Sequence, residues 1–147
     1  MLSAKRVGPS GKVYGLDVTE SMILLARQNA DAAAISNIEF LLGSMEAIPL
    51  PDDSVDVIIS NCVINLAADK HVVLLEAYRV LKKGGKLAVS DIVLRKEFPE
   101  LVRRNVELWL ACIAGALTME EYKNEVQDAG FSMVSIEEVK VYSESDV

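Results

Sequence analysis

The sequence has few of the features that mark membrane, secreted or nucleic-acid-binding proteins. No stretch approaches the roughly 20 apolar residues that a membrane helix requires, and we expect no secretory signal because the first residues lack an apolar segment. The 15 basic residues are outnumbered by 22 acidic ones, which gives a formal net charge of -7 and disfavours phosphate binding. The two cysteines and the expected lack of a secretory signal predict a cytoplasmic protein with reduced thiols. The short apolar runs and the acidic charge balance predict no membrane partner and no nucleic-acid partner.

Ligands for a conventional metal site are also scarce. Zinc takes four ligands that often come in closely spaced pairs, whereas Cys62 and Cys112 are 50 positions apart. His71 is the only histidine, and the sequence shows no positioned partner that would let it act as a general base, so we interpret it as a surface residue. The two cysteines are either buried, inert thiols or two thiolates that folding brings together for a soft, thiol-seeking substrate.

What the chain does contain is an alternation of strand-like and helix-like segments. The expected strands are residues 11–17, 37–42, 55–59, 86–93, 131–136 and 139–142. The expected helices are residues 20–33, 70–82, 99–114 and 119–130. This order predicts one α/β domain over residues 1–147 with a Rossmann-like three-layer fold. Its sheet is expected to be mostly parallel, and the two closely spaced last strands are expected to add an antiparallel edge.

Local signals set the limits of these segments. Thr19 and Asp69 are expected N-caps, and Thr118 with Glu121 forms a predicted capping box. The pair Gly84-Gly85 is expected to stop the second helix, because glycine adopts the backbone conformation of a helix end without steric cost.

Apolar spacing predicts which faces are buried. The first helix is expected to bury Met22, Ala26 and Ala30, and the second to bury Leu74, Ala77, Tyr78 and Leu81. The third strand has a β-branched run, Val55 and residues 57–59, that is typical of a strand buried on both faces. Before it, Pro49 and Pro51 limit residues 45–51 to a loop or a single turn.

Polar side chains follow the predicted strands at their carboxyl ends, where ligands of open α/β sheets bind. Asp17 ends the first strand, and its carboxylate can accept both hydroxyls of a ribose or can simply terminate the strand at the surface. Met45, which follows Gly43-Ser44, can lie flat against an adenine ring or fill the core. Asn61 and Cys62 follow the third strand, which makes them candidates for the site of chemistry.

Several motifs resemble those of known families. Residues 11–22 (GKVYGLDVTESM) and 43–49 (GSMEAIP) are similar to class I S-adenosylmethionine-dependent methyltransferases. Within that superfamily, residues 60–66 (SNCVINL) and 112–116 (CIAGA) resemble arsenite methyltransferases. Residues 78–85 (YRVLKKGG) and the strand with Ser90-Asp91 resemble both the superfamily and the arsenite methyltransferases. The resemblance therefore covers nearly the whole chain.

The resemblance implies a role for each matching residue. Asp17 would hold the ribose diol of the cofactor S-adenosylmethionine, and Met22 would lie close to the cofactor. Met45 would line the adenine pocket, with Glu46 near the adenine amino group. Asn61 would help to close the site near the reactive methyl group.

The two cysteines complete the implied site. Cys62 and Cys112 would bind trivalent arsenic as thiolates, the small-molecule substrate being arsenite or its thiol conjugates. Trivalent arsenic prefers sulfur ligands and keeps a lone pair, which can displace the sulfonium methyl group without a general base. The protein would mainly supply proximity and alignment. A methyltransferase of another substrate class, such as quinone C-methylation, and a non-enzymatic domain that binds a metalloid or a partner are the alternatives.

One departure from the family pattern concerns the start of the chain. These methyltransferases begin with a strand and a glycine-rich loop, but no Gly-x-Gly element precedes Asp17. We expect an N-terminally truncated chain that lacks the strand between the Asp17 strand and the strand of residues 55–59. Apolar faces and two strand edges would then be exposed, unless the sheet closes up or a homodimer covers the gap. We also expect this chain alone to bind S-adenosylmethionine weakly or not at all.

Overall fold

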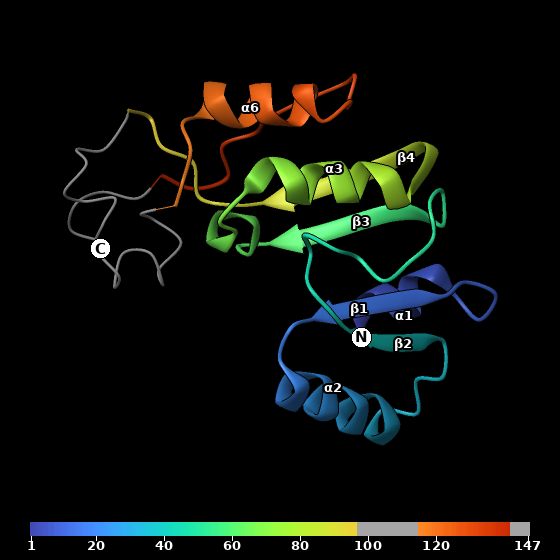
Figure 1. Ribbon diagram of the computed structural model, residues 1–147. Helices are drawn as coiled ribbons and strands as arrows, with labels where there is room; N and C mark the ends of the chain where they lie inside the picture. The colour runs from blue at the N-terminus through green and yellow to red at the C-terminus, as the bar shows by residue number, and fades with distance from the viewer. Residues whose placement is uncertain (97–114, 142–147) are drawn as a thin grey trace. The chain divides into compact units, whose positions relative to one another are not determined.

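The computed structural model describes residues 1–96 and 115–141, in which helices and strands alternate (Figure 1). The chain divides into two compact units. The first unit comprises Met1–Ile58 and Arg79–Lys86, and the second comprises Ile59–Tyr78 and the described part of Leu87–Val147. Each unit therefore combines segments that are distant in sequence. No helix in the described ranges is long and apolar enough to cross a lipid bilayer.

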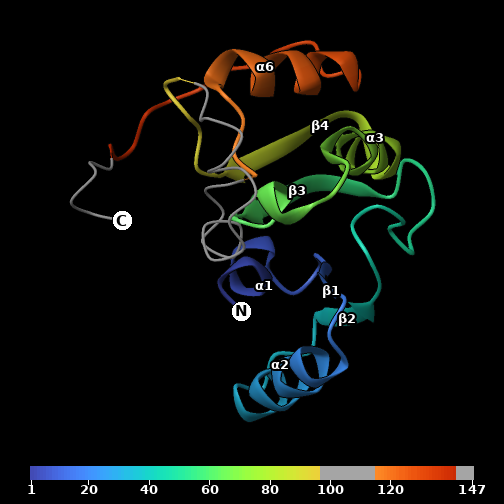
Figure 2. The same cartoon turned by 60° about the vertical axis from the view of Figure 1, so that its left-hand side comes forward.

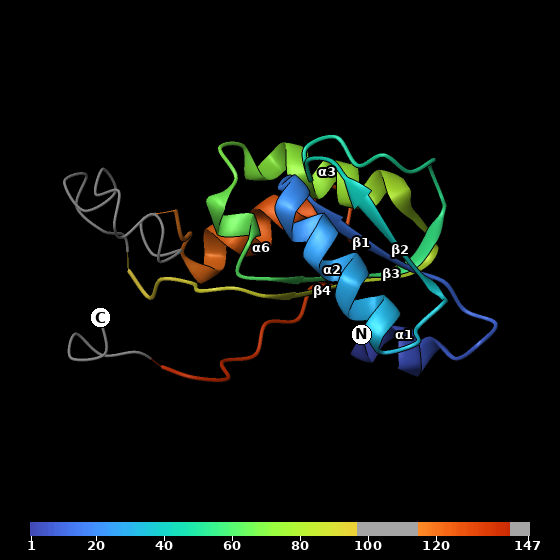
Figure 3. The ribbon, with the colours of Figure 1, turned by 90° about the horizontal axis from the view of Figure 1, so that it is seen from below.

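The first unit is built around a βαβ element, drawn in blue and teal in Figure 1. After α1 (Leu2–Val7), the chain forms β1 (Val13–Asp17), α2 (Glu20–Ala32) and β2 (Ile38–Leu42). The two strands pair in parallel, with Val13 opposite Ile38 and Asp17 opposite Leu42. Both strands contact α2, which lies along them in Figure 3 and provides the crossover that a parallel pair needs.

The buried face of α2 differs by one residue from the predicted one. Ile23 and Ala30 are each 4% exposed, whereas Met22 is 46% exposed, so the prediction of Met22 as a core residue is wrong. Ile23 precedes Ala30 by seven residues, which places both on one face of the helix, and Ile23 is buried there in place of Met22. Thr19 is the N-cap, as predicted, but its side chain makes no capping bond. Its N–H instead donates to Asp17 Oδ1 at 2.8 Å, which ties the start of α2 to the end of β1.

A second sheet joins β3 (Val55–Asn61) to β4 (Leu81–Ser90), with α3 (Lys70–Val80) between them in sequence. The Ser54 N–H donates to the Val80 carbonyl at 2.8 Å just before both strands begin. The Cys62 N–H donates to the Ser90 carbonyl at 2.9 Å where they end. Because both bonds follow the same direction along the two segments, the pair is parallel.

The end of α3 and the start of β4 come earlier than the sequence predicts. Asp69 caps α3, as predicted, by accepting the Val72 N–H at 3.1 Å. The helix stops at residue 80 and the strand begins at residue 81, so the predicted limits at residues 82 and 86 are wrong. The carbonyl of residue 80 already bonds to the segment before β3, which starts the pairing early. Gly84, at φ 79°, therefore bends β4 rather than ending the helix.

The strand β3 is not buried on both faces. Val57 and Ile59 are 54% and 69% exposed, which overturns that prediction. Alternate residues of a strand point to opposite faces, so these two side chains belong to one open face. The pairs β1–β2 and β3–β4 form separate two-stranded sheets, so each described strand pairs on one side only. The expected exposed apolar face and unpaired strand edges are therefore present among the described residues.

The second unit packs α6 (Met119–Asp128) beside α3, as Figure 1 and Figure 2 both show. The predicted capping box of α6 is confirmed: Thr118 accepts the Glu121 N–H at 3.2 Å, and Glu121 accepts the Thr118 N–H at 2.8 Å. Tyr78 of α3 contacts Phe131 edge to face, with ring centroids 5.3 Å apart, but remains 50% exposed. The other predicted core residues of this stretch are buried: Leu74, Ala77 and Leu81.

The C-terminal part differs most from the prediction. Residues 131–141 form no strand, so the predicted strands 131–136 and 139–142 are absent as far as the described residues reach. An isolated pair of short strands is only marginally stable in water, and this segment has no ladder partner among the described residues to support it. The predicted helix at 99–114, with Cys112, lies outside the described residues. The α/β class and the parallel pairing are confirmed, whereas the antiparallel edge is not formed in residues 131–141.

Candidate functional site

The carboxyl ends of β1 and β2 bring Asp17 to the base of a glycine-containing loop. The Gly43 N–H donates to the Asp17 carbonyl at 3.0 Å, so the two strands end at the same edge. The Asp17 side chain is half-buried, and its Oδ1 accepts the Thr19 N–H. Its Oδ2 has no hydrogen-bond partner among the described residues and can accept an external hydroxyl. This is the edge at which ligands of parallel α/β sheets bind.

Residues 43–51, the proline loop, carry Met45 and Glu46. A Cβ on Gly43 would lie 3.2 Å from Pro49 and 3.3 Å from Leu16, so the loop folds closely against the end of β1. Ser44 donates its hydroxyl to the Glu46 carboxylate and accepts the Glu46 N–H, which fixes the first half of the loop. Met45 and Glu46 are half-buried in this turn. The predicted loop between the second and third strands is confirmed.

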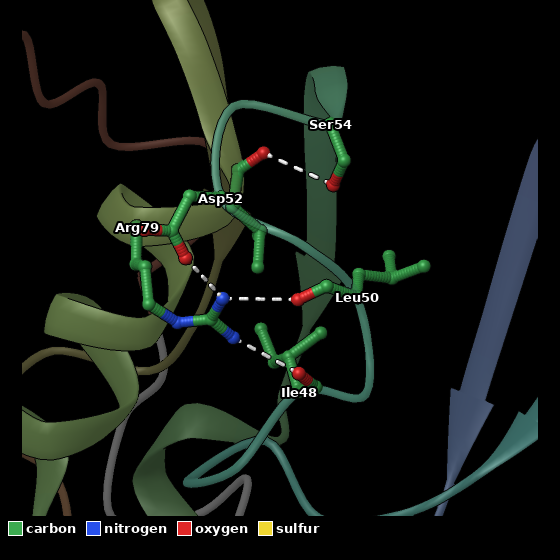
Figure 4. Close-up of polar contacts among 6 residues, drawn as sticks. Ile48, Leu50, Asp52, Ser54 and Arg79 are labelled. Carbon is green, nitrogen blue, oxygen red and sulfur yellow. Dashed lines mark hydrogen bonds and ion pairs between the residues drawn. The ribbon is translucent and has the colours of Figure 1, made fainter.

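The second half of the proline loop is held by Arg79, as Figure 4 shows. Its guanidinium donates to the Leu50 carbonyl at 2.9 Å, to the Ile48 carbonyl at 2.9 Å and to Asp52 Oδ1 at 2.7 Å. Sequence reasoning gave Arg79 no role. The available signal was the pair of prolines, because carbonyl groups in a stretch without ladder partners need donors from elsewhere.

In the second unit, Cys62 follows β3 in an unusual backbone conformation. Asn61, the last strand residue, is exposed, and Cys62 is half-buried. Its φ of 56° lies in the left-handed region, which costs a residue other than glycine about 1–2 kcal/mol. This conformation turns the chain abruptly from β3 into the short helix η1 (Ile64–Leu66). Left-handed residues that are not glycine are uncommon and gather at functional positions.

A buried amide lies next to this turn. Asn65 is 0% exposed, and its side-chain amide donates to the Ile92 carbonyl at 2.8 Å. Its Oδ1 is buried without a hydrogen-bond partner among the described residues. Gly115 packs against the Asn65 backbone so closely that a Cβ would lie 2.1 Å from the carbonyl oxygen. In the sequence, Asn65 stands out only as part of the motif of residues 60–66. No local pattern predicts its contact with residues 92 and 115.

Three titratable side chains, Asp91, Tyr122 and Lys70, also belong to this region. The Tyr122 hydroxyl donates to Asp91 Oδ2 at 3.0 Å. Burial raises the pKa of Asp91 above its ordinary 3.8, and the Tyr122 hydrogen bond, the Cys62 backbone N–H and the Lys70 charge oppose the rise. Burial lowers the pKa of Lys70 from 10.5, although Asp91 acts in the opposite direction. Burial and the Asp91 carboxylate together raise the pKa of Tyr122, so it remains a proton donor.

His71 has a partner that the sequence did not reveal. Its Nδ1 lies 3.2 Å from Glu125 Oε2, and this contact joins α3 to α6. The interpretation of His71 as a half-solvated surface residue still holds, since its side chain is 42% exposed. The sequence did not show this partner, because Glu125 follows 54 residues later in the chain.

The predicted site residues thus fall into two groups, each within one unit. Asp17, Met22, Met45 and Glu46 belong to the first unit, where the acid and the loop residues share the end of the β1–β2 pair. Asn61 and Cys62 belong to the second unit. Cys112 lies outside the described residues. Within residues 1–96 and 115–141, no cluster of three or more His, Cys, Asp or Glu side chains forms a metal site.

Comparison with known proteins identifies the family. Residues 1–130 match the family described as a methyltransferase domain, and the chain belongs to that family. It is 44% identical over 135 residues to the arsenite methyltransferase of Halobacterium salinarum, and the alignment covers 92% of this chain and 34% of that protein. It is 40% identical over 134 residues to the human arsenite methyltransferase, covering 85% of this chain and 36% of the relative. The chain therefore spans about a third of the length of these curated relatives.

Solved structures give the same class. The arsenic(III) S-adenosylmethionine methyltransferase of Chlamydomonas reinhardtii aligns with a TM-score of 0.83 and 40% identity, over 88% of this chain and 46% of that one. A SAM-dependent methyltransferase from Aquifex aeolicus aligns with a TM-score of 0.68 and 29% identity, over 86% and 62%. The Rossmann-like fold class of S-adenosylmethionine-dependent methyltransferases is confirmed.

The described residues fit the adenosine half of S-adenosylmethionine, the cofactor that the family and the fold imply. Asp17 offers an unpaired carboxylate oxygen for a ribose hydroxyl, at the end of a parallel strand. Gly43 keeps the backbone close where a side chain would collide with Pro49. Met45 adds a polarizable thioether of the kind that packs well against an aromatic ring.

Proposed function

We propose that this chain forms part of an arsenite methyltransferase, in which Cys62 and Cys112 hold trivalent arsenic as thiolates. The observation that carries the proposal is the position of Cys62, a half-buried cysteine in a left-handed turn directly after β3. Its neighbours Ser60, Asn65 and Asp91 each have a buried oxygen without a hydrogen-bond partner among the described residues. The identity of 38–44% to three arsenite methyltransferases over most of this chain supports the same substrate.

The contact of Gly115 with Asn65 supports the pairing of the two cysteines. Asn65 follows Cys62 by three residues, and Gly115 follows Cys112 by three residues. Three residues span at most about 11 Å. Since Gly115 packs directly on the Asn65 carbonyl, the connectivity of the chain allows both thiols to reach one arsenic atom.

The chain's own groups would bind and orient the two reactants. Asp17 accepts the ribose hydroxyls, Met45 and Glu46 contact the adenine, and Met22 lies close to the same ligand. Asn61 closes the site near the methyl group. S-adenosylmethionine supplies an electrophilic methyl group when it is bound. Methyl transfer would form the As–C bond as the sulfonium S–C bond breaks and S-adenosylhomocysteine leaves, so the cysteines would act by holding arsenic in line rather than by proton transfer.

Arsenite binding tests the proposal directly. We expect arsenite to quench the fluorescence of Trp109, the only tryptophan, in the wild-type chain. Cys62→Ser and Cys112→Ser should each abolish the quenching, because one remaining thiolate cannot chelate arsenic. Met133→Ser, which removes a sulfur from a side chain that is 95% exposed, should leave it unchanged. Quenching as strong as in the wild type in either cysteine variant would contradict the assignment.

Quinone C-methylation is the second candidate. The demethylmenaquinone methyltransferase of Listeria welshimeri is 37% identical over 91 residues, covering 62% of this chain and 39% of that protein. Such a reaction needs no thiolate ligands. If the cysteine variants keep methyl transfer to a quinone precursor and the wild type ignores arsenite, this second function is the correct one.

We also propose that a second copy of the chain covers the open face of β3, on which Val57 and Ile59 are exposed. Exposed apolar strands with an unpaired edge favour association. Sedimentation at micromolar concentration should then detect a dimer, and Ile59→Lys should shift it to a monomer. A stable wild-type monomer under these conditions would contradict the dimer.

A further inference from the structure

The proline loop contains carbonyl groups that secondary structure does not satisfy. Pro49 and Pro51 lack an N–H, so this part of the loop has few donors of its own. Each proline also disfavours a helical conformation at the residue before it, Ile48 and Leu50. Within the loop the Leu50 N–H donates to the Ile48 carbonyl at 2.7 Å, and further hydrogen bonds come from a donor in another segment.

Arg79 is that donor, from the end of α3. Two of its nitrogens, Nη1 and Nη2, reach the Leu50 and Ile48 carbonyls, each at 2.9 Å. Figure 4 shows the guanidinium facing both carbonyl groups, with a third contact to Asp52. A planar guanidinium presents donors in a fixed fork, whereas a lysine ammonium is a single point that cannot reproduce this geometry.

The backbone around Arg79 strengthens the link. The Arg79 carbonyl accepts the Asp53 N–H at 3.0 Å, and the next carbonyl, of Val80, accepts the Ser54 N–H at 2.8 Å. These are carbonyl groups that the end of a helix leaves without intrahelical partners. The loop is thus fixed at one end by Gly43 on β1 and at the other by α3, with Met45 and Glu46 between the two anchors.

We propose that Arg79 is a positioning residue for adenine recognition, acting through the proline loop rather than by touching the ligand. The inference rests on the proposed binding of S-adenosylmethionine by Asp17, Met45 and Glu46. In this arrangement, the hydrogen bonds of Arg79 to Ile48 and Leu50 set the positions of Met45 and Glu46 relative to Asp17.

The first test measures the loop itself by amide hydrogen exchange on the full chain. In Arg79→Lys, exchange at Ala47 and Leu50 should be roughly tenfold faster, the change expected when hydrogen bonds to a charged donor are lost. Asp52→Ala keeps both carbonyl bonds and should change exchange little. Lys82→Gln removes a neighbouring positive charge that pairs with Asp56 and should have no effect on the loop. Unchanged exchange in Arg79→Lys would overturn the proposal.

The second test measures binding of adenosine and of arsenite separately. Arg79→Lys should weaken adenosine binding at least about fivefold, as expected from a misplaced contact surface, while arsenite quenching of Trp109 stays unchanged. Equal adenosine affinity in the variant and the wild type, or loss of both ligands together, would overturn the positioning role. If the wild type itself binds no adenosine at millimolar concentration, the proposed cofactor site fails and the inference fails with it. Arsenite quenching reports separately on the cysteines.

Discussion

In the first unit, Asp17 and the proline loop are held mainly by backbone groups: a parallel strand pair, a bond from Gly43 to the end of β1, and a guanidinium that binds carbonyl oxygens. In the second unit, Cys62 lies among side chains that bond to distant partners, such as Tyr122 with Asp91. Most contacts of the first arrangement are made by backbone groups, and Arg79 is the one side chain on which our proposal makes the loop depend. The second depends on single residues, several of them buried and polar.

The largest effect is expected at Gly115 of the second unit. Gly115→Ala puts a Cβ at 2.1 Å from the Asn65 carbonyl, so the backbone must move and the free energy of unfolding should fall by about 3 kcal/mol. Gly84→Ala is the matched control in the first unit, because it adds strain at φ 79° without a contact and should cost about 1 kcal/mol. Urea unfolding measures both, and equal losses would contradict the close fit at Gly115.

A pH-dependent loss is expected for Tyr122→Phe. Since the pKa of Asp91 is raised in the fold, stability decreases as pH rises from 3.8 through the higher folded pKa, and the Tyr122 hydrogen bond limits this decrease. Without it, the loss should be about 2 kcal/mol at a pH above the folded pKa of Asp91, where the acceptor is charged, and about 1 kcal/mol at a pH below it. Unfolding at the two pH values checks this. A loss that does not depend on pH would show that the bond is not made to the carboxylate.

The next effect concerns the first unit. Asp17→Asn keeps an oxygen for the Thr19 N–H but loses the charge that strengthens hydrogen bonds to ribose hydroxyls. Adenosine should bind about tenfold more weakly, while the free energy of unfolding and arsenite quenching stay the same. A calorimetric titration measures this. Loss of arsenite quenching in the same variant would show that the two groups of residues are coupled.

The smallest effect is expected at the surface ion pair of Lys82 with Asp56. The side chains are 46% and 79% exposed, and such pairs contribute less than about 1 kcal/mol. Lys82→Gln should therefore change the unfolding midpoint by little more than the error of the measurement. A large loss there would weaken the view that the first unit is held by its backbone.

The same division explains what could be predicted from the sequence. The first four strands, the loop and the caps of α3 and α6 were predictable because spacing, prolines and capping residues act within a few positions. Asp17, Met45 and Cys62 were predicted as site residues because they follow strands or match family motifs, and these roles stay predictions. The partner of His71 and the roles of Asn65, Tyr122 and Arg79 were missed, since each contact joins segments separated by 27 or more residues.

The burial of β3 was predicted wrongly for a related reason. Its β-branched residues are typical of a strand with covered faces, but coverage depends on neighbours that a local pattern does not specify. Val57 and Ile59 are open in the described residues. The absent strands at 131–136 and 139–142 show the same dependence, since strand propensity needs a partner to take effect.

The left-handed backbone at Cys62 sets a trade-off between stability and function. Asparagine and glycine occupy that conformation with less strain than cysteine does, so replacing Cys62 with either would make the turn easier to form while removing the thiol that we propose as an arsenic ligand. Libraries screened only for thermal tolerance should therefore lose this cysteine early.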